Sequence, residues 1–226
     1  MTFQLWGATL HEFDVAFTDF LLFVESGLFA CLLARLKTPE NMLQRLFCAL
    51  FVLLGISSLL GALFHAFFPA KATTPGGFVM WMLIGLSIGL AAVVIWYINA
   101  YILNLGRFLR VMPLFTGIYL LIFIYVLVFV SYQFKTIIAF YLPPMIVLAV
   151  VSFVRWRQTR AVHWLWMFMS IGLSFVAAAI QFLRIGIHPV YFNHNAVYHV
   201  VQGVALALLF LAFSRILKVG SLWIAR

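Results

Sequence analysis

The stretch FVMWMLIGLSIGLAAVVIWYINAYILN, residues 78–104, contains no charged side chain and decides the class of the protein. An α-helix needs about 20 apolar residues to cross the hydrocarbon core of a bilayer, and this stretch exceeds that length. Similar runs recur along the whole chain. They lie near residues 16–36, 44–68, 78–104, 109–131, 135–155, 162–186 and 195–217.

The overall composition supports the same conclusion. Of the 226 residues, 66% are hydrophobic and only 8% are charged, and the mean hydropathy is +1.16; both values exclude a soluble domain. Because lipid offers no partner for free backbone N–H and C=O groups, continuous apolar runs of this length cross as helices. The sequence therefore predicts an all-α membrane protein, a bundle of seven transmembrane helices that forms a single domain over residues 1–226.

The net charge of +9 reflects basic residues that alternate between the ends of these helices. One end carries Arg35, Lys37, Arg45, Arg107, Arg110, Arg155, Arg157, Arg160, Arg215, Lys218 and Arg226. The other end carries Lys71, Lys135 and Arg184. This asymmetry follows the positive-inside rule and predicts an N-terminus outside and a C-terminus in the cytoplasm. Basic residues placed in this way anchor the protein at the membrane surface, and we expect no nucleic-acid partner.

The start of the chain resembles no cleaved signal peptide. The first apolar run follows the acidic stretch HEFDVAFTDF, residues 11–20, and lacks a basic n-region and a small-residue cleavage site. We therefore expect this run to remain as the first helix. The protein is then a multi-pass integral membrane protein, of a bacterial inner membrane or an endomembrane.

Polar residues interrupt several of the apolar runs at helical spacing. These stripes are Asp14, Thr18 and Glu25 in the first run, Ser58, Gly61 and His65 in the second, Ser170, Ser174 and Gln181 in the sixth, and Asn195, His199 and Gln202 in the seventh. Residues four and seven apart share one helix face, and polar faces in a membrane bundle turn toward its interior. The sequence also predicts Asn193 as the N-cap of the last helix, with His194 at the helix start.

Four of these residues define a predicted site. With the N-terminus outside, Glu25, His65, Asn195 and His199 share the outer leaflet, so we expect the first, second and seventh helices to meet there at a polar cavity. Glu25 lies deepest. A carboxylate near the middle of a bilayer is costly and marks a functional interior.

Two short motifs carry a resemblance to a known superfamily. With seven helices, GALFHAF at residues 61–67 and NAVYH at residues 195–199, the chain resembles a divergent branch of the membrane hydrolases that include alkaline ceramidases and adiponectin-type receptors. That superfamily carries S-x-x-x-H in helix two, H-x-x-x-H in helix seven and an aspartate in helix two or three. Three histidines there hold zinc, whose bound water attacks a lipid amide. His65 and His199 match two of the three histidines.

The chain also departs from this pattern. Gly61 stands at the position of the serine, Asn195 at that of the first histidine of helix seven, and helix three has no aspartate. A catalytic zinc takes three protein ligands and a water. A third ligand would have to come from an acid on the first helix or from His194. The acids available there are Asp14, Asp19 and Glu25.

The resemblance implies specific roles for these residues. His65, His199 and Glu25 would hold zinc, and Glu25 and Ser58 would take part in catalysis on a lipid-like substrate. The residues expected to surround and orient these groups are Asn195, Gln202, His194 and Asp19.

Other interpretations remain open at this point. The protein binds membrane lipids without catalysis, as a receptor-like member of the same superfamily, or it holds haem between His65 and His199. In the simplest interpretation, the two histidines only form hydrogen bonds between helices.

Overall fold

The computed structural model confirms an all-α bundle and describes residues 2–5, 8–38, 41–188 and 191–219. Over these residues, seven helices are long and apolar enough to cross a membrane. They are α1 (Phe13–Ala34), α2 (Asn41–Phe67), α3 (Pro75–Ile102), α4 (Met112–Tyr125), α5 (Phe134–Thr159), α6 (Val162–Phe182) and α7 (His194–Val219). A π-helical segment, Val126–Val130, extends α4 into a span of 19 residues. This is the integral membrane architecture that the apolar runs predict.

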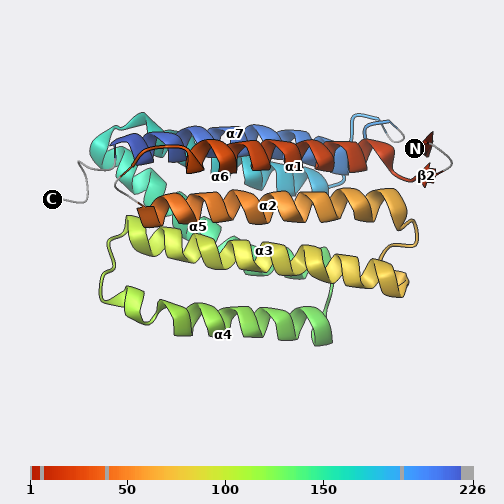
Figure 1. Cartoon of the computed structure of the whole chain (residues 1–226), viewed down its shortest axis with the longest axis horizontal. Helices are drawn as coiled ribbons and strands as arrows, with labels where there is room; N and C mark the ends of the chain where they lie inside the picture. The colour runs from red at the N-terminus through yellow and green to blue at the C-terminus, as the bar shows by residue number, and fades with distance from the viewer. Residues whose placement is uncertain (1, 6–7, 39–40, 189–190, 220–226) are drawn as a thin grey trace.

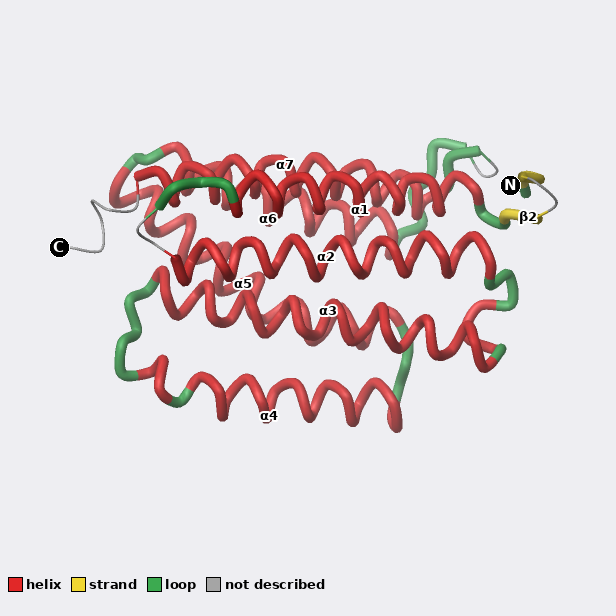
Figure 2. Tube along the Cα trace, in the orientation of Figure 1, coloured by secondary structure: helices red, strands yellow, loops and turns green. Residues whose placement is uncertain are grey.

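Six of the helices form a closed ring. α1 packs on α2, α2 on α3, α3 on α5, α5 on α6, α6 on α7, and α7 returns to α1. α4 lies outside the ring against α3, as Figures 1 and 2 show. α1 begins and α7 ends at opposite ends of the bundle (Figure 1). We call the end near the start of α1 the N-terminal end of the bundle.

Aromatic side chains fill the core between α1, α2 and α7. The rings of Phe47 and Phe213 stack with centroids 3.6 Å apart, and both side chains are fully buried. Phe29 stacks on Phe210 in the same way, at 4.5 Å. Aromatic pairs add to the energy of burial, and here they fix the position of α7 against α1 and α2.

Two local features attach α4 to the ring. Gly89 of α3 lies against Phe123, and a Cβ atom at position 89 would stand 2.4 Å from that ring. Pro144 in α5 has no N–H to donate to the carbonyl of Phe140 four residues earlier. The hydroxyl of Tyr119 in α4 donates to that carbonyl instead. α5 therefore continues past Pro144 with the carbonyl of Phe140 satisfied.

A short hairpin precedes α1 and was not expected from the sequence. Strands β1 (Phe3–Leu5) and β2 (Ala8–Leu10) pair antiparallel. Just after β2, the N–H of His11 donates to the carbonyl of Ala66 over 2.9 Å. This bond links the chain before α1 to the end of α2.

The alternation of the helices places the two groups of basic residues at opposite ends of the bundle. Lys37 follows α1, for example, and Arg157 lies in the last turn of α5. Both are at the end of the bundle away from the N-terminus. Lys135 and Arg184 lie at the N-terminal end. The geometry thus fits the charge asymmetry, and the assignment of one side as cytoplasmic stays a prediction.

Cysteine labelling tests the orientation. In a chain whose Cys31 and Cys48 are replaced by alanine, we expect Lys37→Cys and Arg157→Cys to react with a membrane-impermeant maleimide only after the cells are opened, because the positive-inside rule predicts both in the cytoplasm. Lys135→Cys serves as the control and should react from outside intact cells. Labelling of positions 37 and 157 from outside would reverse the topology.

Candidate functional site

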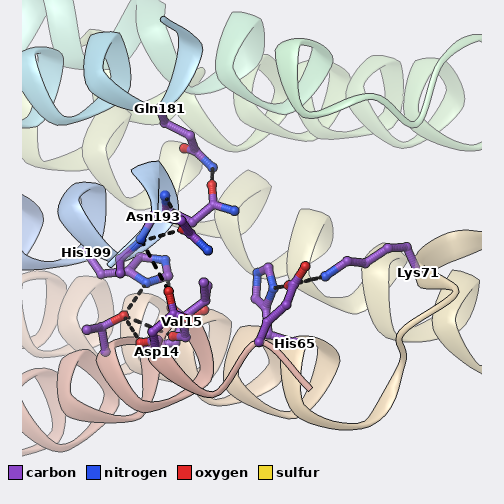
Figure 3. A network of polar contacts seen from close by, with 12 residues as sticks. Asp14, Val15, His65, Lys71, Gln181, Asn193 and His199 are labelled. Atoms are coloured by element: carbon purple, nitrogen blue, oxygen red, sulfur yellow. Dashed lines mark hydrogen bonds and ion pairs between the residues drawn. The ribbon is translucent and has the colours of Figure 1, made fainter. Parts of the chain in front are cut away.

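A network of polar contacts joins α1, α6 and α7 near the N-terminal end of the bundle, and Figure 3 shows it beside a second group of contacts around His65. At its centre His199 of α7 is almost completely buried. Its Nδ1 lies 2.9 Å from the Thr18 hydroxyl oxygen, and its Nε2 lies 3.3 Å from Oδ1 of Asp19. Because both ring nitrogens have partners on α1, the imidazole is held in one orientation.

Asp19 is also buried, and α2 makes room for it. A Cβ atom built on Gly61 would stand 2.5 Å from Oδ2 of Asp19, closer than real contacts allow. The carboxylate therefore occupies the space that a side chain at position 61 would fill. Gly61 stands where the S-x-x-x-H pattern has its serine, and its lack of a side chain brings α1, α2 and α7 together at Asp19.

The beginning of α7 is fixed by Asn193, and this confirms the predicted N-cap. Its side-chain oxygen accepts hydrogen bonds from the N–H groups of Asn195 at 2.8 Å and Ala196 at 3.3 Å. Its own N–H donates to Oδ2 of Asp14 over 3.3 Å. One asparagine thus satisfies the first turn of α7 and ties it to α1.

The predicted polar stripes of the sixth and seventh helices face one another. Gln181 donates to the side-chain oxygen of Asn195, and Gln202 donates to the Ser174 hydroxyl, each over 3.2 Å. The Ser170 hydroxyl donates to the carbonyl of Ala205 over 2.7 Å. These contacts confirm that both stripes turn to the interior, and they hold α6 against α7.

His65 belongs to a second group of contacts, separate from that of His199 in Figure 3. Its Nδ1 lies 2.5 Å from Oε2 of Glu12, and Lys71 donates to the same oxygen. Glu12 precedes α1 in a left-handed conformation, with φ of 43°. Sequence reasoning missed Glu12 and Lys71. Their opposite charges at one end of the bundle were the available signal.

A cavity of about 130 Å³ opens between α1 and α7, next to His199. It is lined by Thr18, Leu21, Leu22 and Glu25 of α1 and by His199, Val200 and Gly203 of α7. Leu21 and Val200 are each about half exposed, so the mouth lies on the outer surface of the bundle. The carboxylate of Glu25 lies against α7, where Oε2 would stand 3.0 Å from a Cβ on Gly203.

The predicted site residues are only partly brought together. Glu25 and His199 share the cavity, and Asp19 contacts His199, whereas His65, Asn195 and Gln202 make their contacts elsewhere. Ser58 makes no side-chain hydrogen bond to any described residue, and His194 opens α7. Within the described ranges, no three His, Cys, Asp or Glu side chains are arranged to hold a metal ion.

The model of one protein family matches residues 15–218, from the first turn of α1 to the last turn of α7. The chain belongs to DUF6962, a family of unknown function. The part that matches DUF6962 includes every residue of the cavity, whereas Glu12 lies before it. No curated protein and no solved structure matches the chain. The resemblance to alkaline ceramidases and adiponectin-type receptors therefore stays a prediction.

The contacts of Glu12 give this DUF6962 member a pH-dependent link between α1 and α2. The hydrogen bond with His65, reinforced by Lys71, outweighs partial burial and lowers the pKa of Glu12 to about 2. An unfolded glutamate has a pKa of about 4.3. The stabilisation is therefore complete above about pH 5 and is lost as the pH falls toward the folded pKa.

Replacement of Glu12 by glutamine tests this link. We expect Glu12→Gln to lower the melting temperature at pH 7, and the difference from the wild type to shrink as the pH is lowered from about 5. Thermal unfolding in detergent at several pH values measures it. Lys135→Gln, which removes a charge that makes no ion pair among the described residues, is the control. A difference that is constant with pH would contradict the role of Glu12.

Proposed function

We propose that this protein binds a membrane amphiphile whose polar head enters the cavity between α1 and α7. The lining of the cavity supports this proposal because it combines polar and apolar side chains. Leu21 and Val200 are half exposed, and they lie beside the polar side chains of Thr18, Glu25 and His199. Within a membrane span, exposed apolar side chains face lipid tails. An amphiphile in the bilayer therefore reaches the polar groups without leaving the membrane.

The size and surroundings of the cavity limit what it accepts. Its volume of about 130 Å³ corresponds to roughly four water molecules at about 30 Å³ each. A head of a few heavy atoms fits, and the tail has to remain outside along α1 and α7. Val24 and Val204 are about half exposed on these helices and offer the tail an apolar surface.

The donors near the cavity favour binding over metal or haem chemistry. Both ring nitrogens of His199 are already paired with α1, and His65 is engaged with Glu12 outside the cavity. His65 and His199 therefore do not fit a shared zinc or haem, and Glu25 adds no third ligand. The zinc-dependent lipid hydrolase and the haem protein remain predictions that this arrangement does not support.

Filling the cavity tests the proposal. In Gly203→Leu the new side chain enters the space between α1 and α7, because even its Cβ would meet Glu25 and Leu22. The probe is hexadecanol with a diazirine near the hydroxyl, photolysed with the protein in phosphatidylcholine nanodiscs, and labelled peptides are mapped by mass spectrometry. We expect saturable labelling of α1 and α7 peptides in the wild type and a several-fold loss in Gly203→Leu.

Gly172→Leu is the matched control. Gly172 lies on an exposed face of α6, and nothing would stand within 4 Å of its Cβ atom. This variant should label as the wild type does. If Gly203→Leu and the wild type showed the same labelling of the α1 and α7 peptides, the binding function would be overturned. Labelling that does not saturate in the wild type would overturn it as well.

A further inference from the structure

Glu25 differs from the other polar groups of the cavity because it has no partner. The Thr18 hydroxyl is bonded to carbonyls of its own helix and contacts His199, and both nitrogens of His199 are paired. Glu25 makes no hydrogen bond and no ion pair with any described residue. It is therefore the cavity-lining side chain whose hydrogen-bonding capacity is free for a ligand.

The position of Glu25 makes this free carboxylate costly. Glu25 is the thirteenth of the 22 residues of α1, roughly 18 Å along the helix at 1.5 Å per residue, close to the middle of the bilayer. Charged groups at that depth are expensive unless they are paired. Gly203 lets the carboxylate lie against α7 instead of reaching along α1 toward the membrane surface.

No cation of the described chain neutralises Glu25. The described ion pairs join Glu12 to His65 and Lys71, and Asp19 to His199. The lysines and arginines lie at the helix ends. Glu25 is thus the acid that lines the cavity, and no basic side chain of the described residues stands against it. This environment favours a cationic ligand and repels an anionic one.

We propose that the cavity selects a long-chain amine, whose ammonium head pairs with Glu25 while its alkyl chain lies on the lipid-facing surface of α1 and α7. This proposal rests on the proposed function and specifies the ligand class of the same cavity. An ammonium group with three donors fits a carboxylate that lacks partners, and its small size fits the cavity. Bulky zwitterionic heads exceed the available volume.

Two photoreactive probes with the same chain test the selectivity. They are hexadecylamine and hexadecanol, each carrying a diazirine at the same carbon, with apparent affinities measured by competition with the unlabelled compounds in phosphatidylcholine nanodiscs. A charge-assisted hydrogen bond is stronger than a neutral one, so we expect the amine to bind roughly tenfold tighter in the wild type. Glu25→Gln should abolish this preference and retain binding of the alcohol, which shows that the variant is folded.

Glu12→Gln provides the control, since it removes a carboxylate outside the cavity and should leave the amine preference unchanged. Equal affinities of the two probes in the wild type, or a preference that survives in Glu25→Gln, would overturn the selectivity. If potassium ions displaced the amine probe as effectively as unlabelled hexadecylamine does, Glu25 would bind an inorganic cation. This result would also overturn the selectivity for a long-chain amine. In each of these cases, saturable alcohol binding that is lost in Gly203→Leu would leave the binding function standing.

Discussion

The contact between Asp19 and His199 is the interaction on which the rest of this bundle depends. A buried polar group in lipid has no water to satisfy it, and an unpaired one costs several kcal/mol. Asp19 on α1 and His199 on α7 satisfy each other, and Thr18 occupies the second ring nitrogen. Since α1 and α7 are the first and last helices, this contact closes the ring of six helices.

Two glycines, one on α2 and one on α7, allow this arrangement. Gly61 of α2 leaves the space that the carboxylate of Asp19 occupies, and Gly203 of α7 lets Glu25 approach the α7 backbone. The first glycine supports a paired acid in the interior. The second supports an unpaired acid at a cavity that faces lipid. Two acids of α1 therefore have different roles, since Asp19 supports the ring and Glu25 belongs to the proposed ligand site.

Features that depend on local sequence were predicted well. The seven helices follow from the length and apolarity of each run, and the cap at Asn193 follows from the chemistry of a few neighbouring residues. The stripes of α6 and α7 follow from helical spacing. None of these requires knowledge of how a helix is rotated against a distant one.

The features that were missed depend on that rotation. His65 and His199 share a depth, and depth alone suggested a common site, but His65 turns toward Glu12 while His199 turns toward Asp19. The space at Gly61 is visible only once α1 is packed on α2.

A double-mutant cycle on Asp19→Asn and His199→Gln, with unfolding free energies measured in micelles, tests whether the contact between Asp19 and His199 stabilises the bundle. We expect a coupling energy well above about 0.5 kcal/mol, whereas effects that add to within that value would show that the two side chains do not interact.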